Sequence, residues 1–204
     1  RGRAYLAGDL AALNDEQAAA RLDEEIAFAE EGLAWHFRLH AAGVEAIGRL
    51  GWAMVYQLTW SARLVEGVQV GQRTLAALGD AVSADRARVL SALGWAVSIS
   101  GDYAAATATF DQARALAGQV GDERSLADVL HMQTIHHLSF GEFAEGVQVG
   151  LKAAATFERD SALWDLCSVQ AFVIYQDGTL GSREQATSLG DKTLATAERL
   201  SHLG

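Results

Sequence analysis

The sequence has no proline among its 204 residues and only one cysteine, Cys167. Proline is the commonest helix breaker, so its absence favours long helices. A single cysteine excludes an internal disulfide and is most simply explained by a reducing compartment. No run reaches about 18 uninterrupted apolar residues, and no basic, apolar leader opens the chain. We expect a cytoplasmic protein without membrane contact and, because the first residue is arginine, a segment of a longer polypeptide.

Basic residues are also scarce. The chain has 26 acidic and 16 basic residues, a net charge of −10 and a pI near 5.0. No basic patch is present to drive counterion release from a phosphate backbone, which argues against direct nucleic-acid binding. Half of the residues are hydrophobic, so the chain can bury a large core and is not a disordered tail.

Catalytic motifs are missing as well. The sequence contains no phosphate-binding glycine loop, no dinucleotide fingerprint, no His-Glu-x-x-His helix, no EF-hand loop and no paired cysteines. The stretch around Asp177 and Gly178 is faintly similar to an aspartyl-phosphatase motif, but Tyr175 stands in the nucleophile's place. We interpret Asp177-Gly178 as an ordinary turn. The prediction is a protein with no catalytic residue, no cofactor and no metal.

Histidines leave one alternative open, a helical metalloenzyme. His36 and His40 have the spacing of a metal-chelating pair on a helix, and a second group has Asp128 one turn before His131. Neither supplies the third ligand that a stable site needs. We expect His40 and His136 to pack or hydrogen-bond at helix contacts, while His36, His131 and His137 face solvent or a groove. Cys167 is expected to be a small buried hydrophobic residue.

The sequence contains an internal repeat. The hexamer EGVQVG occupies residues 66–71 and returns at 145–150. Stepping by 39 or 40 residues from Gly71 gives Phe110, Gly150 and Gly190, and two further columns contain only small residues. Small residues at spacings of three, four and seven lie on one helix face and let a neighbouring helix approach closely. These columns are Gly67, Ala106, Gly146 and Ala186, and Thr74, Ala113, Ala153 and Thr193.

Each repeat contains two apolar-periodic segments separated by a break, and the segments are too long for strands. The sequence therefore predicts an N-terminal helical segment over 1–42, with a long helix at 15–41, and four helix pairs over 43–204. A helical hairpin cannot bury its apolar face alone, so the pairs should stack into an all-α solenoid whose inner face forms a binding groove. The predicted pairs are 43–60 with 62–78, 84–100 with 103–118, 122–139 with 143–158, and 160–176 with 182–202.

The second unit resembles a tetratricopeptide repeat. It carries the family's Leu-Gly pair at Leu93 and Gly94, the turn GDY at 101–103, and then Ala106, Phe110 and Ala113 at the family's spacing. The resemblance implies a groove lined by the first helix of every pair. The groove residues carried over from the family are Arg49, Trp52, Tyr56, Arg88, Ser91, Trp95, Asp128, His131, Ile135 and Tyr175, together with Ala171.

Residues 30–78, with LAWHF at 33–37 and AAG at 41–43, resemble the segment that follows the ATPase module in LuxR-type and related bacterial signal-transduction ATPases. This resemblance implies a sensing or scaffolding part of a larger signalling or transcription-regulatory protein. The leading hypothesis is thus a non-catalytic scaffold that binds a protein, a peptide or other domains of its parent chain, and a homodimer is left open. The alternative is a small-molecule sensor, for which we expect a closed apolar pocket near Trp52 and Trp95.

Overall fold

The computed structural model describes residues 26, 27, 31 and 44–201. Residues 44–201 form eight helices and contain no strand, which confirms the prediction of an all-α fold. Of the predicted helix at 15–41, only the three helical residues 26, 27 and 31 fall within the described part. The helices are α3 (Val44–Trp60), α4 (Leu64–Leu78), α5 (Ala84–Ile99), α6 (Tyr103–Val120), α7 (Glu123–Phe140), α8 (Phe143–Arg159), α9 (Leu163–Thr179) and α10 (Arg183–Ser201).

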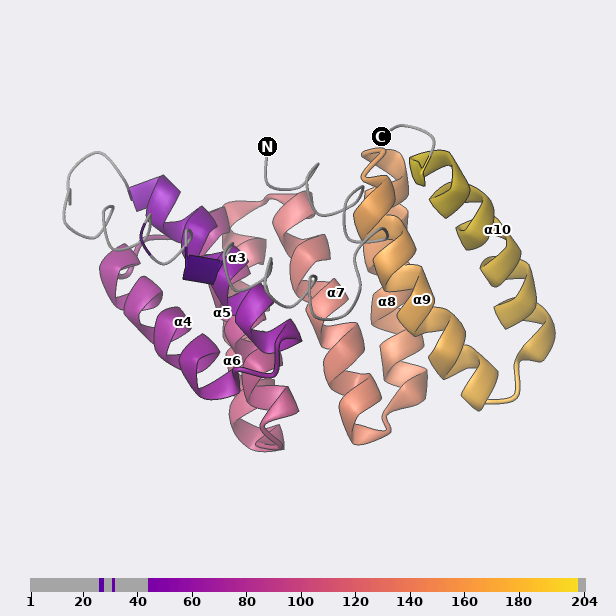
Figure 1. Ribbon diagram of the computed structural model, residues 1–204, viewed down its shortest axis with the longest axis horizontal. Coiled ribbons are helices and arrows are strands. Elements are labelled where there is room, and N and C mark those ends of the chain that lie inside the picture. Colours follow the sequence, from indigo (N-terminus) through magenta and orange to yellow (C-terminus); the bar gives the residue numbers. More distant parts are fainter. Residues whose placement is uncertain (1–25, 28–30, 32–43, 202–204) are drawn as a thin grey trace.

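The helices are arranged as consecutive hairpins that follow one another from one end of the molecule to the other (Figure 1). We call α3, α5, α7 and α9 the A helices and their hairpin partners α4, α6, α8 and α10 the B helices. Each A helix packs against the B helix that follows it, and α5 also packs extensively against α3 and α7. By contrast, α9 packs mainly on α8 and α10 and touches α7 little. This stack of hairpins is the predicted α-solenoid.

Close helix approach explains the small-residue columns. A Cβ atom added at Gly150 would lie 2.4 Å from Cγ2 of Val173, on α9, and one at Gly71 would lie 3.2 Å from Cδ1 of Leu93, on α5. At Gly190, in the last described B helix, nothing lies within 4 Å. In this column, a glycine is therefore needed for packing where the A helix of the next hairpin lies against it.

The turn inside each hairpin recurs with the same period. In each of these turns one residue of positive φ reverses the chain. Gly101 and Gly141 take this role in two hairpins, with φ of 88° and 78°. The equivalent residue of the first hairpin is Ala62, with φ of 58°, and Ser161, between α8 and α9, has φ of 54°. A side chain at positive φ is strained, so these two turns are less favourable than their glycine counterparts.

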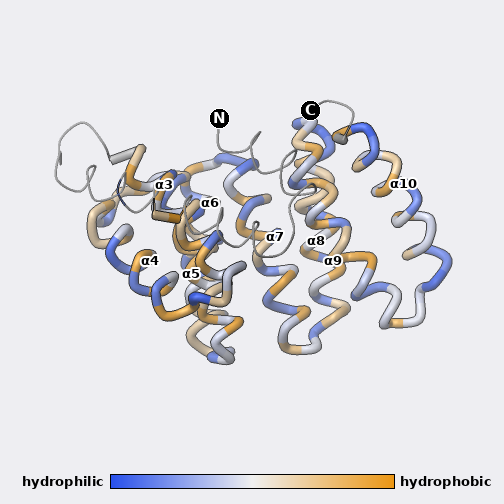
Figure 2. Tube along the Cα trace, in the orientation of Figure 1, coloured by the Kyte–Doolittle hydropathy of each residue, from blue (hydrophilic) through white to orange (hydrophobic). Residues whose placement is uncertain are grey.

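The core runs between the A and B helices and also between neighbouring A helices. Phe110 of α6 and Phe157 of α8 are fully buried and anchor two apolar clusters. Figure 2 shows that hydrophobic and hydrophilic residues are mixed along the helices, with hydrophilic residues along much of α10. Within the described residues, every helix is too short or too polar to cross a lipid bilayer.

Candidate functional site: the face of the A helices

The predicted groove residues lie on the A helices, in repeat-equivalent positions, but their accessibility differs. At the two ends, Arg49 and Tyr175 are exposed, Tyr175 to 62%. In the middle, Ser91, Trp95, His131 and Ile135 are at most 5% exposed. The remaining four, Trp52, Tyr56, Arg88 and Asp128, are half-buried.

Aromatic rings fill the N-terminal part of this face. The ring centroid of Trp95 in α5 lies 5.2 Å from that of Tyr56 and 5.1 Å from that of Trp60, both in α3. Trp52 continues the cluster, with its centroid 6.0 Å from Tyr56. Trp95 is 3% exposed, and its buried indole N–H makes no hydrogen bond within the described structure. The rings pack against one another, so Trp95 contributes to the core between α3 and α5.

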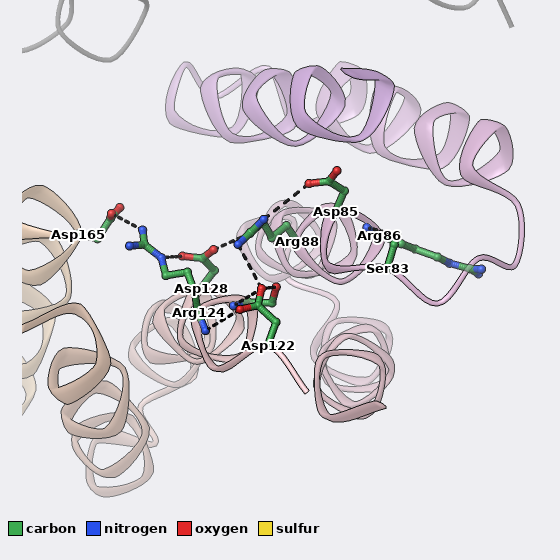
Figure 3. Close-up of polar contacts among 9 residues, drawn as sticks. Ser83, Asp85, Arg86, Arg88, Asp122, Arg124, Asp128 and Asp165 are labelled. Atoms are coloured by element: carbon green, nitrogen blue, oxygen red, sulfur yellow. Dashed lines mark hydrogen bonds and ion pairs between the residues drawn. The ribbon is translucent and has the colours of Figure 1, made fainter. Parts of the chain in front are cut away.

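A chain of charged groups connects α5, α7 and α9 (Figure 3). Arg88 of α5 donates from Nε to Oδ2 of Asp128 in α7, at 2.7 Å. Arg124 donates from Nε to the other oxygen of Asp128, at 3.2 Å, and also pairs with Asp165 of α9. The Arg124 guanidinium lies 4.8 Å from the ring centroid of Phe157. These contacts link three consecutive A helices.

Two more carboxylates surround Arg88. Its guanidinium nitrogens lie 3.6 Å from Oδ1 of Asp85 and 3.6 Å from Oδ2 of Asp122. Asp122 is also the N-cap of α7, where its side chain accepts hydrogen bonds from the backbone N–H groups of Arg124 and Ser125. The hydrogen bond from the Ser125 hydroxyl is the main reason that the pKa of Asp122 is lowered. Burial raises the pKa of Asp128, against the opposing effect of its two arginines.

His131 differs from the sequence expectation, which placed it toward solvent or the groove. It is 5% exposed, and its Nε2 lies 3.1 Å from Oγ of Ser168 in α9. Burial lowers the pKa of His131 to about 4, so the ring is neutral near pH 7. The expectation was wrong because α9 places a hydroxyl beside the ring and Phe157 and Phe172 pack around it.

This Ser-His contact does not make a nucleophile and base. A ring with a pKa near 4 is a weak proton acceptor at pH 7, and a serine nucleophile needs a base matched to the operating pH. The carboxylate of Asp165 pairs with Arg124 and makes no hydrogen bond to His131 among the described contacts. We interpret the contact as a polar link between α7 and α9.

His136 packs and hydrogen-bonds at a helix contact, as its sequence position predicted. Its Nδ1 lies 2.8 Å from Oγ of Ser98 in α5, and its Nε2 lies 3.3 Å from Oγ1 of Thr107 in α6. Burial lowers the pKa of His136. Its ring stacks on Tyr103, with centroids 5.3 Å apart. The contacts tie the second hairpin to the third.

His137 lies at the same contact between the second and third hairpins and is half-buried. Its Nδ1 lies 2.8 Å from Oε2 of Glu142, and the hydroxyl of Tyr103 donates to Oε1 of Glu142 at 2.7 Å. The Tyr103 hydrogen bond is the largest cause of the lowered pKa of Glu142. Tyr103 and Glu142 occupy equivalent turn regions one repeat apart, so the turns of successive hairpins are joined.

Within the described residues, no group of three or more His, Cys, Asp or Glu side chains is placed to hold a metal ion. His36 and His40 lie outside the described residues. Cys167 is half-buried rather than fully buried, and burial raises the pKa of its thiol, which leaves it protonated at pH 7. Asp177 and Gly178 lie in the last turn of α9 and not in a loop after it, a difference of a few residues in the helix end.

Sequence reasoning missed two features of this face. Trp164, at the start of α9, is 61% exposed, and the charged chain through Arg124 was not predicted. A signal for the chain was present, since Arg88 and Asp128 are opposite charges one repeat apart. No sequence signal separates Trp164 from the buried tryptophan at 95.

No family model matches the chain, and no curated protein matches it. Among solved structures, it is similar to a Podosopora anserina protein assigned as a kinesin light chain with nearly identical TPR-like repeats. A single-substitution variant of that protein shares 14% identity, with 90% of each chain covered and a TM-score of 0.59. A second structure shares 14% identity, covers 89% of this chain and 90% of that one, and has a TM-score of 0.56. The likeness extends to the fold: this chain is an all-α solenoid of TPR-like helical hairpins.

Proposed function

We propose that the chain is a non-catalytic protein-interaction module that binds a protein or peptide along the A helices. The observation that carries this proposal is the accessible aromatic surface of α9. Trp164 and Tyr175 are 61% and 62% exposed, and exposed Ala171 lies between them at helical spacing. Large exposed aromatic side chains that share a helix face are typical anchors of protein interfaces.

A small-molecule sensor is supported less well. That function calls for an enclosed apolar pocket near Trp52 and Trp95. The rings of Trp95, Tyr56 and Trp60 instead contact one another at centroid distances of 5.1 to 6.2 Å, so side chains occupy this space. An extended partner that lies across the exposed aromatic surface of α9 needs no such pocket.

The charge of the chain supports a protein partner over nucleic acid. The net charge is −10, and two arginines in the middle of the A-helix face, Arg88 and Arg124, are engaged by carboxylates. Four carboxylates surround these two guanidinium groups, which leaves the region acidic. A partner with apolar side chains flanked by basic ones would complement this face.

The wider role proposed is the regulatory or scaffolding part of a bacterial signalling or transcription-regulatory protein located in the cytoplasm. This part rests on the sequence resemblance of residues 30–78 to the helical arrays that follow ATPase modules. In that setting the partner would be another domain of the parent protein or a regulator that controls it, and self-association is an alternative use of the same face.

The test compares two surface variants in cells of the source organism. Trp164→Ala with Tyr175→Ala removes the α9 anchors, whereas Val65→Ala with Leu151→Ala removes exposed apolar side chains from B helices. Quantitative mass spectrometry of proteins that co-purify with each variant is the measurement. The proposal expects specific partners to be lost from the first variant and kept by the second. Equal recovery from both variants contradicts it.

A further inference from the structure

The chain of charged groups on the A-helix face ends at Asp165 of α9. Arg124 lies between Asp128 and Asp165, and no interaction drawn in Figure 3 leads beyond Asp165. The Asp165 side chain is 22% exposed, and its Oδ1 makes no hydrogen bond among the described contacts. Helix α9 itself contains no lysine, arginine or histidine. One oxygen of Asp165 is therefore left to accept a hydrogen bond from a partner.

Negative charge is in excess along this chain of charged groups. Two guanidinium groups face four carboxylates, which leaves two negative charges uncompensated when all six groups are ionised. Their side chains are between 14% and 35% exposed, and partly buried charges are screened less by salt than exposed ones. The excess therefore attracts a cation to the α9 end and repels an anionic partner. The six residues are Asp85, Arg88, Asp122, Arg124, Asp128 and Asp165.

Trp164 adds an accessible aromatic side chain at the same end of α9. It directly precedes Asp165 in the sequence and is 61% exposed. In the repeat it is the equivalent of Arg124, which lies 40 residues earlier. The start of α9 therefore combines an exposed ring with a partly accessible carboxylate.

The contacts of Arg124 show what a ring and carboxylates can hold on this face. Its guanidinium lies 4.8 Å from the ring centroid of Phe157 and pairs with Asp128 and Asp165. A guanidinium group is planar, so it can stack on a ring and donate to a carboxylate at the same time, whereas the ammonium group of lysine is a compact point charge. The start of α9 offers the same two kinds of group but supplies no cation of its own.

We propose that the partner of the A-helix face is a basic peptide segment, in which an arginine stacks on Trp164 and pairs with Asp165 while an apolar side chain contacts Tyr175. This inference rests on the proposed function and specifies the chemistry of the partner. Residues 166–176 contain no charged side chain, so the Tyr175 end of the surface suits an apolar group. The net charge of −10 makes an acidic peptide or a second copy of this chain a poor occupant.

The geometry of α9 also sets the spacing of the two anchors on the peptide. Trp164 and Tyr175 are eleven residues apart on one helix, which corresponds to about 16 Å along its axis. About five residues of an extended peptide span this distance. The arginine and the apolar residue should therefore be about five positions apart.

Selection from a phage library of random linear peptides tests this chemistry, with the full chain as bait. Each enriched peptide is measured again on the variant Trp164→Ala with Tyr175→Ala, which identifies the peptides that bind through α9. We expect these peptides to carry an arginine about five positions from an aromatic or large aliphatic residue.

A synthetic copy of the tightest α9-dependent peptide is then titrated by fluorescence anisotropy. Asp165→Asn should raise its Kd about fivefold, the scale of a partly exposed ion pair beside a cation–π contact. Asp191→Asn removes one negative charge from an exposed position on α10 and should change the Kd less than about twofold. Replacement of the peptide's arginine by glutamine should weaken binding to the parent chain and have little further effect on Asp165→Asn. Because that change leaves the protein unaltered, a loss of affinity for the parent chain is still required if Asp165→Asn does not fold.

Three results would overturn the proposal. They are α9-dependent peptides that are acidic or lack arginine, a peptide that binds the parent chain and Asp165→Asn equally well, and equal losses of affinity in Asp165→Asn and Asp191→Asn. None of them contradicts the proposed function, because the peptides still bind through Trp164 and Tyr175. A selection in which no enriched peptide depends on Trp164 and Tyr175 contradicts both.

Discussion

Arg88 in α5 and Asp128 in α7 stand one repeat apart and are joined by a hydrogen bond of 2.7 Å between Nε and Oδ2. Their side chains are 23% and 14% exposed, so the pair is largely removed from water. Asp128 is shared with Arg124, which pairs in turn with Asp165. One carboxylate therefore helps to set the spacing of three A helices.

Asp128→Asn should destabilise the protein, because it leaves two partly buried guanidinium groups with less compensating charge. We expect a loss of about 1–2 kcal/mol, below the cost for a fully buried pair, since water still screens these groups. Urea unfolding is the measurement. Asp111→Asn serves as the control, because Asp111 and Arg114 form an exposed pair, and its effect should stay within about 0.5 kcal/mol. Equal losses in the two variants would contradict the role given to Asp128.

Gly150 and Gly190 occupy equivalent repeat positions and should respond to alanine with opposite signs. Gly150→Ala brings a Cβ within 2.4 Å of Val173 and should destabilise by about 1–2 kcal/mol through overpacking. Gly190→Ala meets no atom within 4 Å and should stabilise by about 0.5–1 kcal/mol through helix propensity. Thermal and urea unfolding of both variants give the comparison. The packing interpretation fails if both substitutions stabilise.

Ala62→Gly and Ser161→Gly should each stabilise the protein by about 0.5–1 kcal/mol. Both residues have positive φ, where glycine avoids a steric cost that slightly exceeds its entropic penalty in the unfolded chain. The reverse change, Gly101→Ala, should destabilise by about 1 kcal/mol, because Gly101 has φ of 88°. Denaturant midpoints test the series. A loss of stability in both glycine variants would show that these turns are not strained.

Stability should decrease as the pH is lowered, in part because of His131. Its pKa falls from 6.5 to about 4 on folding, so the unfolded chain binds more protons between these values. The free energy of unfolding should therefore decrease from pH 6.5 toward pH 4, with His131 accounting for at most about 3 kcal/mol.

His131→Gln separates this contribution from that of the carboxylates. Glutamine can still hydrogen-bond to Ser168 but does not titrate. Urea unfolding between pH 4 and pH 7 should show a shallower decrease for the variant than for the parent chain. Identical slopes would mean that His131 is not buried and neutral in the folded protein.

The repeat made the fold predictable from sequence. The 40-residue period, the small-residue columns and the breaks each have a local physical cause. The all-α class and the stacking of the hairpins could therefore be predicted without tertiary information. The helix ends agree to within a few residues where a glycine turn closes a hairpin, as at Gly101 and Gly141.

Accessibility of the A-helix face could not be predicted in the same way. Trp95 and Tyr175 are equivalent in the repeat, yet one is 3% and the other 62% exposed. The difference arises from neighbours on other helices, Tyr56 and Trp60 beside Trp95, which a single-helix pattern does not encode. His131 was misplaced for the same reason, since Ser168 and Phe172 approach it from α9.

Binding along the A helices is tested most directly by photo-crosslinking in cells of the source organism. A benzophenone amino acid is placed at Tyr175 on α9 or, as the control, at Leu151 on α8, which is 49% exposed. We predict a discrete crosslinked protein partner from position 175 and none from position 151. No crosslink from position 175, or the same crosslinked partner from both positions, would contradict the proposed function.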